Sequence, residues 1–174
     1  MRKILAVLLL LANPAIMLCQ VPFPSGIEIK QFMSSQTCVV LEDGNSAFNV
    51  FIRRAMDEYW KITPYEFIKS EDFKSRKVDP SFSFILLTET NFERDKSASS
   101  YNFINLLQGK EVPEIKQMPE ICALPLSFAG EDDLEYGYKL GAILLFMQKH
   151  AMMISEDPSL TGRRYLKYFL RLCF

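Results

Sequence analysis

The chain has 174 residues, of which 49% are hydrophobic and 13% are aromatic, and its formal net charge is −1. This composition excludes a disordered chain, which would need few apolar residues and a high charge. Because 20 basic residues are balanced by 21 acidic ones, it also excludes a surface that attracts nucleic acid. The length fits one domain.

Residues 1–20 predict a secretory signal peptide. Arg2 and Lys3 give a basic start, residues 4–12 are an unbroken apolar run, and residues 13–14 (Asn-Pro) end it. This is the layout of an export leader, and the run is too short to span a bilayer. We therefore expect an exported protein, periplasmic or secreted, with no transmembrane span in the mature chain.

The fate of this leader leaves three alternatives. Cleavage around Gln20 gives a soluble protein, and we favour it. Lipid anchoring at Cys19 is the second, because Ile16 precedes that cysteine by three positions as in bacterial lipoproteins, although Leu18 is larger than the residue such leaders carry there. An uncleaved leader is the third.

Residues 21–36 contain two prolines and a glycine and predict an extended N-terminal segment. Residues 37–41 (TCVVL) predict a short apolar strand, which a turn signal at residues 42–45 (EDGN) ends. Ser46 then caps a helix that runs to about Trp60, since the apolar residues there recur at a spacing of three and four.

Two further strands follow, with a helix between them. Residues 65–68 and 81–88 are short apolar runs, and Ser70 caps a brief helix that Asp79 and Pro80 end. Strands that alternate with helices imply parallel strands joined by right-handed crossovers. We therefore expect a fold with a βαβαβ start.

The next part of the chain predicts two more strands. Residues 91–100 are polar and predict an exposed loop, and residues 101–107 and 121–128 follow as apolar runs. Pro125 places the last strand at a sheet edge or at a bulge, because proline donates no hydrogen bond to a neighbouring strand.

The remaining sequence predicts two C-terminal helices. The first covers about residues 134–154 and is apolar on all sides in its middle, which places it at the centre of the fold. The second starts near Asp157, and its apolar face lies opposite three basic residues: Arg163, Lys167 and Arg171. Since the sequence ends on the apolar Phe174, the chain is either a truncated form or one whose last helix docks into the core.

These elements predict a single α/β domain over residues 37–174, with a mixed, mainly parallel sheet and helices packed on its faces. Open sheets of this kind bind ligands beyond the carboxyl ends of their strands. Acidic residues follow two of the predicted strands there, and they are candidate metal ligands: Glu42, Asp43, Asp132 and Asp133. Such carboxylates suit Mg²⁺ or Ca²⁺, but turns and helix starts favour acids without any ligand.

Residues 60–68 (WKITPYEFI) are rich in aromatic side chains. One interpretation is a binding surface made by Trp60, Tyr65 and Phe67, because aromatic residues dominate contact hot spots. The other, which we favour, is a corner between a helix and a strand that packs into the core.

No other pattern predicts chemistry. The glycines form no phosphate-binding loop, and no cysteine and histidine spacing predicts a zinc site. His150 is the single histidine and lies in an apolar stretch, so we expect it to be packed rather than catalytic. Cys38 and Cys122 are expected to be buried thiols, with a disulfide between them as the alternative.

Four segments carry a resemblance to a known group of sequences: residues 41–45 (LEDGN), 60–68 (WKITPYEFI), 138–143 (YKLGAI) and 146–148 (FMQ). On these segments the chain resembles uncharacterised exported proteins of Gram-negative bacteria, over most of the mature chain. The resemblance implies that members continue beyond this length, which supports a truncated form. It implies no activity and no site residues.

The sequence therefore predicts a non-enzymatic binding or assembly module of the bacterial envelope, whose ligand or partner protein it does not identify. The alternative is a metal-dependent hydrolase at the acidic rim. The two differ in geometry, because an enzyme should bring Glu42 or Asp43 to within a few Å of Asp132 or Asp133 around a concave pocket.

Overall fold

The computed structural model describes residues 23–91 and 99–161. The predicted leader over residues 1–20 and most of the second C-terminal helix lie outside the described residues. The elements, in chain order, are α2 (Gly26–Met33), β1 (Gln36–Val40), α3 (Ala47–Tyr59), β2 (Tyr65–Ile68), α4 (Ser70–Arg76), β3 (Phe82–Asn91), β4 (Ser100–Gln108), η1 (Ile115–Gln117), β5 (Glu120–Phe128), α5 (Asp133–Tyr136), η2 (Gly137–Lys139), α6 (Leu140–Glu156) and η3 (Pro158–Leu160).

The five strands form one mixed sheet in the order β2-β1-β3-β4-β5. Strand β1 pairs in parallel with β2 and with β3 over four residue pairs each, whereas β3–β4 and β4–β5 are antiparallel over nine and seven pairs. The predicted mixed α/β fold is confirmed, but a mainly parallel sheet with a βαβαβ start is not borne out. Antiparallel ladders dominate, and helix α2 precedes the first strand.

The lengths of the connections explain this difference. Parallel neighbours need a crossover of about a dozen residues or more, usually a helix. Strand β3 ends at Asn91 and β4 begins at Ser100, so the segment between them is too short for a crossover. The connection from β4 to β5 holds only the short η1. The second half of the sheet is therefore antiparallel.

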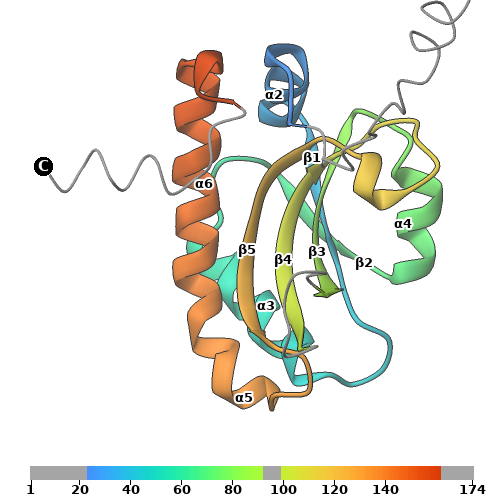
Figure 1. Cartoon of the computed structure of the whole chain (residues 1–174), viewed down its shortest axis with the longest axis vertical. Helices are drawn as coiled ribbons and strands as arrows, with labels where there is room; N and C mark the ends of the chain where they lie inside the picture. Colours follow the sequence, from blue (N-terminus) through green and yellow to red (C-terminus); the bar gives the residue numbers. More distant parts are fainter. Residues whose placement is uncertain (1–22, 92–98, 162–174) are drawn as a thin grey trace, which may run out of the picture.

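Helices cover both faces of the sheet, as predicted. Helices α2, α3 and α6 lie on one face, and α4 lies on the other (Figure 1). The larger core cluster, under the first three helices, contains Phe48, Ile52, Ile85, Leu140 and Leu144 among others. The smaller cluster contains seven buried residues: Cys38, Ile68, Phe73, Phe84, Leu86, Leu107 and Met118.

Helix α2 corrects the prediction of an extended segment over residues 21–36. Ser25 and Glu28 form a reciprocal capping box at its start, in which each side chain accepts a hydrogen bond from the other residue's backbone N–H. Ile29 and Phe32, one turn apart, are fully buried. The prolines and the glycine therefore stand before or at the first position of a helix, where they are tolerated.

Helix α3 begins after Ser46 as predicted, since the Ser46 hydroxyl accepts a hydrogen bond from the backbone N–H of Asn49. The buried amide of Gln148 on α6 connects the end of α3 to α6. It accepts from the backbone N–H of Lys61 at 2.7 Å and donates to the carbonyl oxygen of Tyr59 at 2.9 Å. This side chain fixes the two helices side by side.

The helix predicted over residues 134–154 forms in three pieces, α5, η2 and α6. One side of α6 is buried as expected, through Leu140, Leu144, Met147 and Ala151. The opposite side is not covered by the described residues, because Leu145 stays exposed. No helix among residues 23–91 and 99–161 is long and apolar enough to cross a membrane.

Strand β5 confirms both interpretations of Pro125. It lies at an edge of the sheet, and its pairing with β4 shifts register next to Pro125, which faces Phe103. A bulge accommodates a residue that cannot donate to the ladder.

Candidate functional site

The loop between β1 and α3 forms the predicted rim at the carboxyl end of β1. Asn49 closes this loop, because its side chain accepts from the backbone N–H of Glu42 at 2.9 Å and donates to the carbonyl oxygens of Glu42 and Gly44. Gly44 has a φ of 79°, a left-handed conformation that favours glycine. The EDGN sequence therefore forms a turn that the Asn49 side chain closes through three hydrogen bonds.

Both predicted metal ligands in this loop already accept hydrogen bonds. The Ser46 hydroxyl donates to the Glu42 carboxylate at 2.5 Å, and the Ser70 hydroxyl donates to the Asp43 carboxylate at 2.9 Å. Ser70 is the first residue of α4, so Asp43 connects the β1–α3 loop to the other face of the sheet. These contacts give both acids a structural role.

Two cavities flank the loop. One, of about 730 Å³, is lined by Glu42, Asp43, Arg53, Lys69 and Glu71 among others. The other, of about 550 Å³, lies between β1, β3 and α4 and has a more apolar lining that includes Phe73, Leu86 and Ile115. The predicted rim is thus a hollowed surface that carries both signs of charge.

The structure separates the predicted acids into two pairs. Asp132 and Asp133 follow β5, which lies three positions from β1 in the sheet. At a strand spacing of about 4.8 Å, that separation is about 14 Å. No group of three or more metal-binding side chains occurs in the described part of the chain. Glu42 and Asp43 line both cavities beside the β1–α3 loop, and Asp132 is not among the residues that line them.

The predicted aromatic surface is divided in the same way. Trp60 is buried in the larger core, where its indole N–H donates to the Thr63 hydroxyl at 2.9 Å. Tyr65 and Phe67 are half-buried on the edge strand β2, with their rings edge to face at 5.7 Å. Arg53 lies over the Phe67 ring at 4.4 Å. The corner packs into the core, which agrees with the interpretation we favoured.

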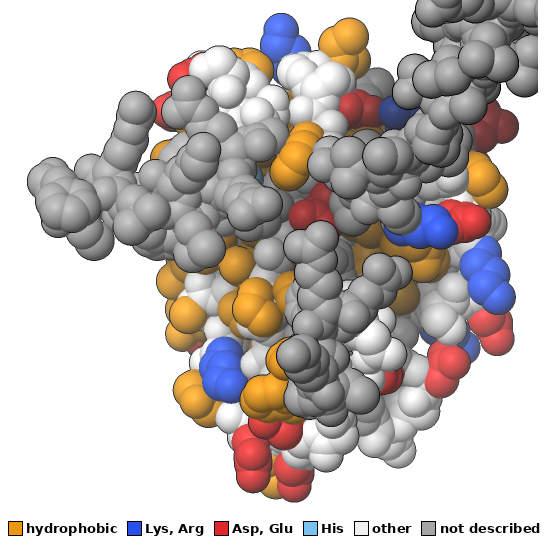
Figure 2. All heavy atoms as spheres, in the orientation of Figure 1, with side chains coloured by type: hydrophobic (Ala, Val, Ile, Leu, Met, Phe, Trp, Pro, Cys, Tyr) orange, Lys and Arg blue, Asp and Glu red, His pale blue; other side chains and the backbone are white. Residues whose placement is uncertain are grey.

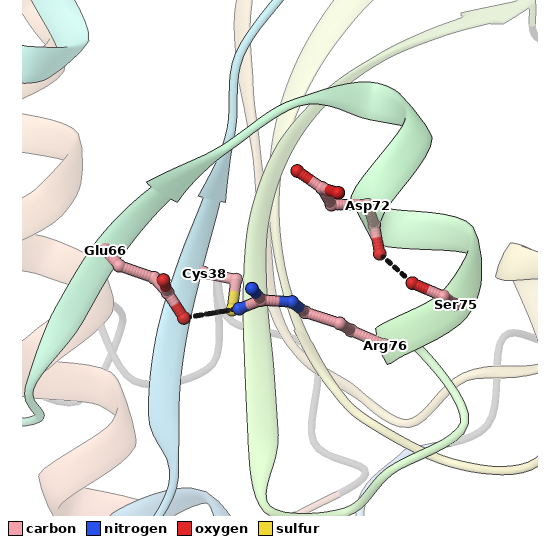
Figure 3. Close-up of polar contacts among 5 residues, drawn as sticks. All are labelled: Cys38, Glu66, Asp72, Ser75 and Arg76. Carbon is pink, nitrogen blue, oxygen red and sulfur yellow. Dashed lines mark hydrogen bonds and ion pairs between the residues drawn. The ribbon is translucent and has the colours of Figure 1, made fainter.

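Cys38 lies beside an ion pair on the α4 face of the sheet. Glu66 and Arg76 form this pair, and each approaches the Cys38 sulfur, at 3.7 and 3.8 Å (Figure 3). Burial raises the pKa of the Cys38 thiol to about 11. A thiol that keeps its proton is a poor nucleophile, so this group packs rather than reacts.

Cys122 is also a free, buried thiol, and burial raises its pKa as well. It belongs to the larger core cluster, whereas Cys38 belongs to the cluster on the opposite face of the sheet. Strands β3 and β4 separate the two residues. The alternative of a disulfide between them is therefore wrong.

His150 is packed, as the sequence predicts. It is buried on α6, with its ring stacked on Phe146 at 6.2 Å, and it forms a hydrogen bond with the backbone of Ile121. Burial lowers the pKa of His150 to about 4, against the weaker opposing effect of that hydrogen bond. The ring is therefore neutral at pH 7.

A third hollow was not predicted from the sequence. This groove, of about 620 Å³, lies between α3 and the α5–η2–α6 segment. Three of its lining residues are large apolar side chains that face solvent: Leu134, Tyr138 and Leu145 are 66%, 78% and 51% exposed. The space-filling view also has hydrophobic side chains at the surface on the α6 side of the molecule (Figure 2).

Two glycines shape this groove. A Cβ atom on Gly137 would lie 2.4 Å from the ring of Phe51, and one on Gly141 would lie 2.6 Å from the ring of Tyr59. Both contacts are shorter than real Cβ atoms make. The glycines therefore let α3 approach the start of α6, while Arg54 and Glu58 of α3 line the same groove.

The sequence contained a signal for this groove. Tyr138 in η2 and Leu145 and Met152 in α6 recur every seven residues, and all three are exposed. An apolar stripe of this kind marks a second covered face. Apolar residues on all sides of a helix predict instead that it is buried at the centre of the fold.

Comparison of the chain with protein-family models, curated proteins and solved structures finds no match. The function is therefore argued from the geometry of the groove and of the rim.

Proposed function

We propose that this chain is a non-enzymatic binding or assembly module of the bacterial envelope, and that it binds a partner protein in the groove between α3 and α6. The exposure of Leu134, Tyr138 and Leu145 around one groove is the observation that carries this proposal. Large apolar side chains gathered at a surface mark interaction sites in soluble proteins, because leaving them in water is unfavourable.

The shape of the groove supports an amphipathic helix as the segment that the partner provides. Two helices form its walls, as in other proteins that bind a helix through apolar residues at positions i, i+4 and i+7. Tyr138 and Arg54 belong to residue types that dominate binding energy at interfaces. The predicted leader supports a partner in the periplasm or outside the cell.

A metal-dependent hydrolase at the rim remains the second candidate, with weaker support. Glu42 and Asp43 line a cavity there, but serine hydroxyls already donate to both carboxylates, and Asp132 lies beyond β3 and β4. Calorimetric titration of the full chain with Mg²⁺ and with Ca²⁺ tests this candidate. No heat of binding at millimolar metal would contradict it.

The binding proposal is tested by comparing two substitutions of exposed apolar residues. Leu145→Asp places a charge in the groove, and Val78→Asp places one between α4 and β3, outside the groove lining. The tagged full chains are used to capture proteins from an envelope extract of the producing bacterium. We expect the proteins bound by the wild type to be retained by Val78→Asp and reduced at least tenfold by Leu145→Asp.

The outcome that contradicts the proposal is equally specific. If all three chains capture the same proteins in the same amounts, the groove is not the binding face. Thermal unfolding of the three chains, followed by circular dichroism, shows that a lost partner does not reflect a lost fold.

A further inference from the structure

We propose that the outer edge of strand β2 binds an extended segment of another protein, which adds to the sheet as an antiparallel strand with a basic residue opposite Glu66. No residue of β2 lines the groove between α3 and α6, so this surface goes beyond the proposed function. Three features of the molecule support it: the backbone of β2, the contrasting edge at β5, and the side chains along β2.

The hydrogen bonds at the two ends of β2 determine which of its backbone groups point outward. The carbonyl oxygens of Pro64 and Ile68 accept hydrogen bonds from N–H groups of the β1 segment, at 2.8 and 2.9 Å. In a parallel ladder, successive residues turn their backbone groups to opposite sides of the strand. Tyr65 and Phe67 therefore turn both their N–H and their C=O groups away from β1. Because β2 is the last strand of the sheet, these groups have no strand partner in the described part of the chain.

The opposite edge of the sheet, at β5, is closed. Pro125 has no N–H to offer there, and Lys139 donates to the carbonyl oxygen of Leu126 at 3.3 Å. His150 forms a hydrogen bond with the backbone of Ile121, and helix α6 packs against the strand (Figure 1). Proteins cover a sheet edge in this way to prevent its pairing with other chains. Among the described residues, no side chain caps the outward groups of β2, so this edge is the one that is left to pair.

Glu66 gives the edge of β2 a preference for a basic residue. Arg76 and the Cys38 thiol both contact the same carboxylate oxygen, Oε1 (Figure 3). No hydrogen bond from the described residues reaches the second oxygen, Oε2, and the side chain is 34% exposed. In an antiparallel pairing, Glu66 takes a non-hydrogen-bonded position, where opposite side chains lie closest. A Lys or Arg of the added strand can therefore donate to Oε2.

The two residues that flank Glu66 give the edge a preference for apolar neighbours on the other face. The rings of Tyr65 and Phe67 are half-buried there and lie edge to face. The Tyr65 hydroxyl donates to the Asp57 carboxylate at 2.6 Å, and Arg53 lies over the Phe67 ring, so both rings are held in place. Aromatic and β-branched side chains form favourable pairs across strands. The segment that fits this edge is therefore apolar, basic and apolar at successive positions.

The same side chains disfavour a second copy of this chain as the occupant. Two β2 strands use all their outward groups when Tyr65 faces Phe67 of the second copy, and Glu66 then faces Glu66 of the second copy. Like charges directly opposite each other destabilise a strand pair. The occupant is therefore another protein that supplies the complementary charge.

Amide hydrogen exchange of the full chain, followed residue by residue by NMR, tests this edge. In the free chain, the Tyr65 and Phe67 amides should exchange fast, whereas those of Glu66 and Ile68 face β1 and should be protected. The probe is the acetylated peptide amide Thr-Val-Lys-Val-Thr at millimolar concentration. Its two valines should pair with Tyr65 and Phe67 and slow the exchange of both amides severalfold.

Two matched control peptides separate recognition of the backbone from recognition of the side chains. The same peptide with N-methyl groups on both valines keeps its side chains but loses the N–H groups that donate to β2, so it should bind at least about tenfold more weakly. A peptide with Gln in place of Lys should bind the wild type severalfold more weakly than the Lys peptide does. The Glu66→Gln chain should bind these two peptides equally, because the charge pair is then absent.

Three outcomes would overturn the proposal. Protection of the Tyr65 and Phe67 amides in the free chain would mean that this chain, or a second copy where protection grows with its concentration, already occupies the edge. Equal binding of the N-methylated peptide would exclude strand addition, and a Lys peptide that leaves both amides in fast exchange would exclude the site. The Leu145→Asp chain should bind the Lys peptide as the wild type does, so failure of this proposal and failure of the groove are told apart.

Discussion

A chain of buried hydroxyl groups fixes Trp60 at the corner between α3 and β2. The indole N–H donates to Thr63, the Thr63 hydroxyl is hydrogen-bonded to that of Thr37 at 2.6 Å, and Thr37 is hydrogen-bonded to Ser83 at 2.9 Å. All three hydroxyl-bearing residues are buried. Each therefore depends on its neighbours for the hydrogen bonds that water would otherwise supply.

Replacing the Thr63 hydroxyl should destabilise the fold. Thr63→Val keeps the volume but leaves the Trp60 N–H without its acceptor, which costs about 1–3 kcal/mol. Urea unfolding measures the free energy, with Thr90→Val near the other end of β3 as the control. A loss confined to Thr63→Val supports the hydroxyl chain, and equal effects of the two substitutions would contradict it.

His150 makes stability depend on pH. Its pKa falls from an ordinary value of 6.5 to about 4 in the folded chain, so the unfolded chain takes up a proton first as the pH is lowered. The stabilising contribution of His150 to the free energy of unfolding should therefore be complete above pH 6.5 and be lost between about pH 6.5 and 4. The His150 contribution to that fall is on the order of 3 kcal/mol.

The variant His150→Gln isolates this contribution, because carboxylates titrate equally in both chains. Urea unfolding at pH 7, 5 and 4 should give a smaller fall for the variant than for the wild type. Identical pH dependence in the two chains would show that His150 is not a buried, neutral group in the fold.

Individual residue roles were predictable where the local pattern determined them. Ser46 caps α3 as expected, and His150 lies among apolar neighbours as its surroundings in the sequence indicated. The partners of Asp43 and Gln148 were not predictable, since Ser70 and Lys61 reach them only after the chain has folded. Long-range contacts of this kind leave no local pattern.

At the scale of elements, the contact between α3 and the start of α6 shapes the groove. Glycine at positions 137 and 141 brings the rings of Phe51 and Tyr59 against the backbone. Residues of any larger size would separate the two elements. These two glycines therefore determine how closely α3 and the start of α6 approach each other along the groove.

A methyl group at position 137 should disturb this contact. In Gly137→Ala the new Cβ would overlap the Phe51 ring, which forces a shift that costs about 1–3 kcal/mol. Gly26→Ala is the matched control, since a Cβ there makes an ordinary contact at 3.5 Å with Pro158. Thermal unfolding should separate the two variants by several degrees, and equal melting temperatures would contradict the close approach.

Most elements were predictable, but their arrangement was only partly so. The strands over β1, β2 and β3 and the helix α3 followed from short apolar runs and from helical spacing. Helix α2 was missed because its prolines precede it and mask its capping box. Element order alone does not predict the antiparallel pairing of β4 with β3, which follows from the short connection between the two strands.

At the scale of the whole molecule, two surfaces that share helix α3 differ in their chemistry. The rim at the end of β1 is polar and already satisfied by hydrogen bonds, through Asn49, Ser46 and Ser70. The groove between α3 and α6 carries the exposed apolar side chains of Leu134, Tyr138 and Leu145, with Arg54 and Glu58 beside them. The sequence predicts the rim because the acidic residues of a turn are neighbours in the chain. It does not predict the groove, because the two helices that form its walls lie far apart in the sequence and come together only in the fold.

The most direct test of the account places a photo-crosslinking amino acid in the groove of the full chain, in living cells that produce it. At position 138 it should form an adduct with a partner protein, and the substitution Leu145→Asp in the same chain should abolish that adduct. At position 78, outside the groove lining, no such adduct should form. Adducts of equal yield at both positions, or an adduct at 138 that survives Leu145→Asp, would contradict the groove as the binding face.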